Sequence, residues 1–213
     1  MRLRLFVILL GVFAQLGSGT AEAASSGPPI EVRPGHDWAA DVGRAALPQA
    51  GRMPGEFTVA EAMRLLYGSF DPGSGTSEWR PGDAVEPLGD YFAQDAHSRF
   101  LAEPVLVAPV SAGGKPMRLL VTEASPRGYD CVYCHGLAGV ALFEQEGDGW
   151  RLVSGNRAAA FSDHGKGASR PYVLQDADDR FWIAIHSRTE RGGVGSGSVS
   201  LVGMLPDGFK EIF

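Results

Sequence analysis

The sequence predicts an α+β fold that is mostly β, in which one helix precedes an antiparallel meander of about eight strands. Three observations predict this fold. Apolar side chains recur with a helical period between residues 57 and 70. From residue 101 onwards, apolar and polar residues alternate with a period of two, which is typical of strands. Short turns rich in Gly and Asp separate these runs, and no helical segment lies between them to connect parallel strands.

Residues 1–23 have the features of a secretory signal peptide. Arg2 and Arg4 precede an apolar run over residues 5–16, and Ala21 and Ala23 are the small residues of a cleavage site after Ala23. The apolar run has about 12 residues, whereas a membrane-spanning helix needs about 20. We therefore expect an exported chain, periplasmic or extracellular, that has no membrane span after the signal peptide is removed.

Residues 24–56 are expected to form a lead-in segment, because five prolines interrupt a stretch of Gly, Ala and Ser. Trp38 suggests that part of this lead-in docks on the rest of the protein. Residues 57–213 are expected to form a single β-rich domain with the helix at its N-terminal end.

The helix is expected to begin after Thr58, which is a candidate N-cap. Glu61 follows at the spacing of a capping box, in which each of these two residues bonds the backbone N–H of the other. Gly68 is the expected stop. Four apolar residues should share one face of this helix by their spacing: Ala62, Met63, Leu66 and Phe70. Residues 71–90 are expected to be loop, and residues 91–100 fit either a short helix or a strand.

The strands are expected in pairs joined by short turns. Asp148-Gly149 and Gly113-Gly114 favour tight hairpins because these residues accept positive φ angles. The expected strands cover residues 104–111, 117–124, 140–146, 150–154, 171–175, 181–187, 199–205 and 209–213. Residues 193–197 are expected to be a mobile hairpin loop. The apolar stripe of Phe181, Trp182, Ile183 and Ile185 is expected to be core.

Composition excludes several classes of function. The chain has 213 residues, of which 44% are hydrophobic and 21% charged, as in ordinary globular proteins. The net charge of −6 argues against a nucleic-acid partner, because such proteins concentrate Lys and Arg. No nucleophile stands beside a recognisable base, so catalysis is not expected.

The only two cysteines lie in the pentapeptide Cys131-Val132-Tyr133-Cys134-His135. In an exported protein such a pair is normally oxidised. We therefore expect a structural Cys131–Cys134 disulfide, no metal and no cofactor. Two alternatives stay open: a redox dithiol, and a zinc site that combines both cysteines with two of His135, His164 and His186.

A third alternative is covalent haem. The pentapeptide continues as Gly136-Leu137-Ala138-Gly139, and these nine residues resemble the Cys-x-x-Cys-His-Gly-x-x-Gly motif of class I cytochromes c. The resemblance implies haem c attached at Cys131 and Cys134, with His135 as the proximal ligand, and a role in electron transfer. Those cytochromes bury haem among helices, whereas the residues after Gly139 are expected to form a strand.

Residues 100–213 also loosely resemble a group of uncharacterised exported bacterial proteins. In that group a Cys-x-x-Cys loop precedes an apolar strand and a return strand that carries Trp, as Cys131, Cys134 and Trp150 do here. The resemblance implies a fold and an export route but no activity. The expected function is therefore binding or interaction, with an envelope protein or a small ligand as partner.

Overall fold

The computed structural model describes residues 30–31, 51–80, 99–127, 135–164, 170–175, 180–191, 194–205 and 208–213. The expected signal peptide, Trp38, Cys131 and Cys134 lie outside these residues.

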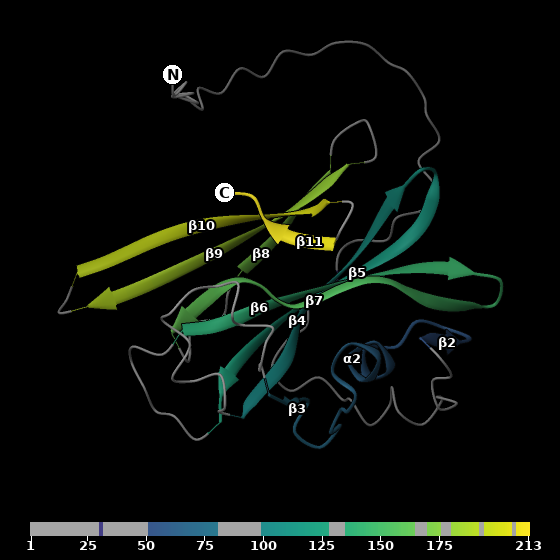
Figure 1. The fold of residues 1–213 in the computed structure, drawn as a ribbon, viewed down its shortest axis with the longest axis horizontal. Helices are drawn as coiled ribbons and strands as arrows, with labels where there is room; N and C mark the ends of the chain where they lie inside the picture. Colours follow the sequence, from purple (N-terminus) through teal and green to yellow (C-terminus); the bar gives the residue numbers. More distant parts are fainter. Residues whose placement is uncertain are drawn as a thin grey trace, which may run out of the picture.

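The strands of the described residues form two antiparallel sheets (Figure 1). The first sheet is built mainly from four long strands: β4 (Phe100–Ala112), β5 (Lys115–Pro126), β6 (His135–Glu146) and β7 (Gly149–His164). Short strands extend its edges: β1 (Ile30–Glu31) and β3 (Ser77–Trp79) pair with β4, and β2 (Arg52–Pro54) pairs with β7. The second sheet has the order β11-β10-β9-β8, from β8 (Arg170–Gln175), β9 (Phe181–Arg191), β10 (Val194–Leu205) and β11 (Gly208–Glu211).

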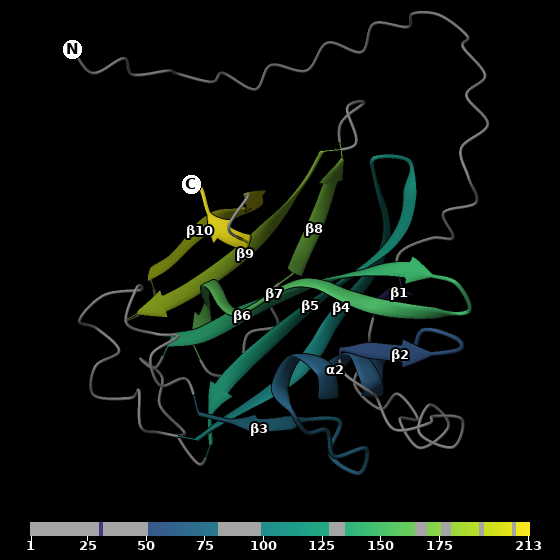
Figure 2. The same cartoon turned by 45° about the vertical axis from the view of Figure 1, so that its right-hand side comes forward.

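Helix α2 (Val59–Tyr67) and the second sheet cover opposite faces of the first sheet (Figures 1 and 2). One core therefore lies between α2 and the first sheet, and it includes Met63, Phe100 and Phe143. A second core lies between the sheets and includes Leu142 and Ile183. Asn156 in β7 links the sheets, because its side-chain amide donates to the Phe209 carbonyl at 2.8 Å.

The prediction of a mostly β fold with one helix ahead of antiparallel strands is confirmed. Seven of the eight expected strands lie inside observed strands, and the eighth overlaps β11. The strands do not form one continuous meander, however, but divide between β7 and β8 into two sheets. Two packed sheets bury each other's apolar faces, which a single open sheet of this size cannot do.

The caps of α2 follow the sequence signals closely but not fully. Thr58 is the N-cap, its Oγ1 accepts from the Glu61 backbone N–H at 3.4 Å, and Gly68 ends the helix with φ of 86°. The reciprocal bond of the expected capping box is absent, because the Thr58 N–H is directed to Sδ of Met53 at 3.2 Å. The Glu61 carboxylate instead approaches the Thr58 hydroxyl, and burial raises the pKa of Glu61.

Four expectations from the sequence need correction. The lead-in contributes strands β1 and β2, and Met53 in β2 is fully buried. The expected loop over residues 71–90 contains β3. Residues 194–197 of the expected mobile loop belong to β10. This segment is rich in glycine, but the backbone hydrogen bonds that pair it with β9 do not depend on side chains. Trp182 lies outside the core, on the opposite face of β9 from the buried Ile183.

Candidate functional site

The cysteine motif lies at the connection between β5 and β6. Cys131 and Cys134 are outside the described residues, so their pairing stays a prediction. His135 begins β6, and its backbone is directly opposite His164 of β7. His186 lies in the second sheet, where it pairs with Arg170. The structure thus brings two of the three expected histidines to neighbouring positions on adjacent strands.

This placement bears on whether the chain could hold haem. The haem alternative stays a prediction, because Cys131 and Cys134 lie outside the described residues. The residues after the motif form strand β6, whose Leu137 and Val140 are fully buried in the two cores. A strand therefore follows the motif at the place where class I cytochromes c have helical surroundings.

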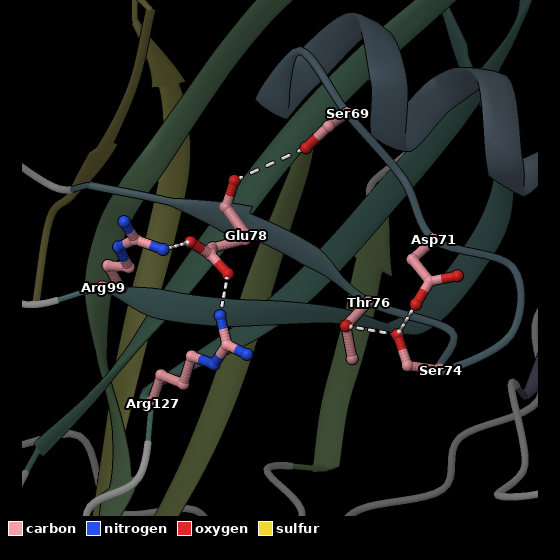
Figure 3. A network of polar contacts seen from close by, with 7 residues as sticks. All are labelled: Ser69, Asp71, Ser74, Thr76, Glu78, Arg99 and Arg127. Atoms are coloured by element: carbon pink, nitrogen blue, oxygen red, sulfur yellow. Dashed lines mark hydrogen bonds and ion pairs between the residues drawn. The ribbon is translucent and has the colours of Figure 1, made fainter.

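A different site lies between the C-terminal end of α2 and the start of the first sheet (Figure 3). It is a cavity about half open to solvent, with a volume of about 390 Å³, close to the lower limit of ordinary ligand pockets. Its lining combines hydroxyl, carboxylate and guanidinium groups with two apolar residues: Ser69, Phe70, Asp71, Ser74, Thr76, Glu78, Leu101 and Arg127.

One wall of this cavity is the turn from Asp71 to Thr76. Asp71 Oδ1 accepts from the Gly73 N–H at 2.9 Å, and Oδ2 accepts from the Ser74 hydroxyl at 2.8 Å. Ser74 Oγ also lies 2.8 Å from Thr76 Oγ1 (Figure 3). The Ser74 hydroxyl and the Gly73 N–H lower the pKa of Asp71, because both donate to its charged form. Asp71 is thus an ionised carboxylate that holds the turn in place.

The other wall is organised by Glu78 on β3. Its Oε1 accepts from Nη1 of Arg99 at 2.8 Å, and its Oε2 accepts from Nη1 of Arg127 (Figure 3). Arg99 and Arg127 lie beside each other because the Arg127 N–H donates to the Arg99 carbonyl at 2.6 Å, next to the β4–β5 pair. Glu78 is held by both guanidinium groups, one from each side.

These contacts determine what the cavity can bind. Both carboxylates already accept hydrogen bonds at each of their oxygens. A guanidinium carries five N–H donors, so one bond to Glu78 leaves donors on Arg127 for a ligand. Each carboxylate oxygen keeps a second lone pair, so the lining offers acceptors as well as the Arg127 donors, and the matching ligand is a small molecule that carries both hydroxyl groups and acceptor oxygens. Phe70 and Leu101 give it an apolar wall.

Sequence reasoning did not single out this cavity. The run Asp71-Pro72-Gly73-Ser74 carries the signal of a turn in which Asp bonds the backbone two residues on, and this local part could have been found. The pairing of Glu78 with Arg127 joins residues 49 apart in sequence, and no local pattern indicates it.

Comparison with known proteins finds no matching family model, no matching curated protein and no matching solved structure. Among the described residues, no helix is long and apolar enough to cross a membrane. Within that same part of the chain, no three His, Cys, Asp or Glu residues are grouped so that they could hold a metal ion.

Proposed function

We propose that this protein is an exported binding protein, which holds a small hydroxylated organic acid in the cavity between α2 and β3. The observation that carries this proposal is the arrangement around Glu78, where two arginines share one carboxylate at the edge of the half-open cavity. Arginine recognises carboxylates through charge-assisted hydrogen bonds, and the hydroxyls of Ser69 and Thr76 suit a ligand with hydroxyl groups. Export is supported by the signal-peptide features of residues 1–23.

The side chains that line the cavity support binding more than catalysis. Asp71 is engaged in its own turn and Glu78 in two ion pairs, so neither is placed as a general base. The turn is organised before any ligand arrives, which lowers the entropic cost of binding.

Ligand binding should be visible as thermal stabilisation. D-gluconate and L-malate are suitable probes, and sorbitol is the neutral control that lacks a carboxylate. At 100 times the Kd, binding contributes about 2.7 kcal/mol, which raises Tm by roughly 5–10 °C for a chain of this size. Arg127→Ala should weaken the apparent affinity about 10-fold or more, because it removes a charge-assisted hydrogen bond.

The matched control for this test is Arg52→Ala. Arg52 is also an exposed arginine, paired with Glu146 at 3.6 Å, but it lies on β2 and does not line the cavity. This variant should retain the stabilisation of the wild type. An equal Tm shift in the wild type and in Arg127→Ala, or no shift with either acid, would remove the cavity as the binding site.

The cysteine pair has a separate role in the proposal. We expect a Cys131–Cys134 disulfide that constrains the connection between β5 and β6.

The disulfide can be tested by mass and colour. The exported protein should be colourless, and its intact mass should be two hydrogens below that of the reduced chain. Cys131→Ser should lower the free energy of unfolding by about 2 kcal/mol, the value expected for a loop this short. A red sample with added covalent mass would establish haem instead, and a reduction potential well above about −300 mV would favour a redox role.

A further inference from the structure

Glu61 carries the most deeply buried carboxyl group among the residues that the structure describes. It lies in the first turn of α2 and is 1% exposed. Its Oε2 accepts from the Thr58 hydroxyl at 3.4 Å, whereas its Oε1 is buried and has no hydrogen-bond partner in this part of the chain. A charge on such a carboxyl has lost its water and has gained one long hydrogen bond in return, so burial disfavours the ionised form.

The charged groups around α2 do little to compensate a charge on Glu61. Arg64, three residues further along the helix and half-exposed, is the described cation that acts on it. The other charged side chains on the strands packed against α2 have partners elsewhere or lie on the far face: Arg52 and Arg151 with Glu146, Glu78 with Arg99 and Arg127, Arg157 over the Trp79 ring, and Glu103 on the face of β4 away from α2. Tyr67, the other buried titratable group of α2, is bonded to Thr122. Within the described residues, Glu61 is therefore a buried acid without an ion pair.

Glu144 on β6 is a buried carboxylate whose charge is compensated. It is 9% exposed, but its Oε1 accepts from Nζ of Lys115 and its Oε2 accepts from Nη2 of Arg151 at 2.8 Å. The Lys115 hydrogen bond, and to a lesser degree the Arg151 guanidinium, lower the pKa of Glu144. Burial raises the pKa of Glu61 instead, and its long hydrogen bond and nearest cation offset this only in part.

Proton uptake by Glu61 favours the docked helix over the undocked one. In the undocked chain Glu61 loses its proton near the ordinary pKa of 4.5, whereas in the docked helix it keeps the proton to higher pH because its pKa is raised. The stability that the neutral carboxyl contributes is therefore fully present below about pH 4.5 and is lost as the pH rises through the folded-state pKa. We propose that α2 is a pH-sensitive element of this protein, which packs more tightly on the first sheet when Glu61 is protonated.

The pH-sensitive helix leads directly into the wall of the cavity. It ends at Gly68, whose N–H donates to the Arg64 carbonyl at 2.7 Å, and the lining residues Ser69, Phe70 and Asp71 follow at once. Local opening of α2 at higher pH therefore also loosens this wall. That link to ligand binding rests on the proposed function, whereas hydrogen exchange of the α2 amides reports on the helix whether or not a ligand binds.

Amide hydrogen exchange of the exported protein at about pH 4.5 and about pH 7.5 tests the proposal, with protection factors corrected for the pH dependence of the intrinsic rate. Glu61→Gln keeps the shape of the protonated side chain but cannot ionise. The ratio of Glu61→Gln protection to wild-type protection over α2 should be about fivefold or more higher at the upper pH, because only the wild type then buries a poorly compensated charge. Glu61→Met also lacks an ionisable group and should give the same rise, even if either substitution changes stability by a constant amount.

Glu211→Gln is the matched control, because it removes the same charge at an exposed position of β11 in the second sheet. Its ratio to the wild type over α2 should be the same at both pH values. A ratio for Glu61→Gln that does not change with pH would overturn the proposal. A ratio that falls toward the upper pH would overturn it as well, because the ionised carboxylate would then be the form that stabilises the helix, through the positive end of the helix dipole.

Discussion

Replacing Gly139 by alanine should lower the free energy of unfolding by about 3 kcal/mol. A Cβ at this position would lie 2.4 Å from Thr122 Oγ1 and 2.5 Å from the Tyr67 hydroxyl. These two oxygens are hydrogen-bonded to each other at 2.6 Å in the core, and both residues are buried. Overpacking costs about 1–3 kcal/mol, and separating a buried hydrogen-bonded pair adds a comparable amount.

Chemical denaturation monitored by tryptophan fluorescence measures this effect. Gly155→Ala is the control, because the one close approach of its Cβ would be to the flexible end of Leu66, with Cδ1 at 2.9 Å, while Leu152 and Ala141 would be at ordinary contact distances, and the change should cost about 1 kcal/mol. The cost of Gly139→Ala should also fall in a Tyr67→Phe background, where one of the two clashing oxygens is gone. Equal costs for the two glycines would contradict the assignment of the effect to the Tyr67–Thr122 pair.

Phe143→Ala should lower the free energy of unfolding by about 3–5 kcal/mol, the usual cost for a fully buried phenylalanine. Phe143 lies in the core under α2, and its ring meets the ring of Phe57 edge to face at 5.4 Å. Phe57 in turn meets Trp150 at 5.5 Å. Loss of Phe143 therefore leaves a cavity and removes support from the segment that leads into the helix.

The same denaturation experiment checks this value, with near-ultraviolet circular dichroism as a second probe of the aromatic cluster. Phe213→Ala is the control, because this phenylalanine is 83% exposed at the end of the chain and should change stability by less than about 0.5 kcal/mol. A Phe143→Ala variant as stable as Phe213→Ala would mean that α2 does not pack on the first sheet as the structure has it.

The sequence predicted correctly those features that depend on interactions among a few neighbouring residues. An N-cap and a helix stop depend on a few neighbouring residues, so Thr58 and Gly68 mark the ends of α2. The β6–β7 hairpin lies where the sequence predicted it, but its turn is at Gly147-Asp148 and not at Asp148-Gly149: Gly147 has the positive φ of 63°, and Gly149 already pairs with Glu146. Alternation with period two located the strands for the same reason. The second hydrogen bond of the expected capping box does not form, and no local pattern could have shown this. The Thr58 N–H is directed to Met53, which is held in place by the pairing of β2 with β7.

The candidate site was not predictable in this way. Asp71 and Ser74 are neighbours in sequence, but the cavity also needs Glu78 on β3 and Arg127 at the end of β5. Their approach depends on β3 and β5 both pairing with β4, which is a property of the folded sheet. The opposition of His135 and His164 is likewise set by the register of β6 and β7.

The sequence by itself determined that this chain has one short helix followed by antiparallel strands, because helix caps, turns and side-chain alternation act over a few residues. Only the tertiary structure decided that the strands divide into two sheets, and that Trp182 faces outward while Ile183 faces inward. Alternation states which residues share a face, but not which face is covered. Which face is covered depends on which distant strand packs against it. The free energy of burying apolar side chains is gained only when the two layers come together, so no single segment determines it.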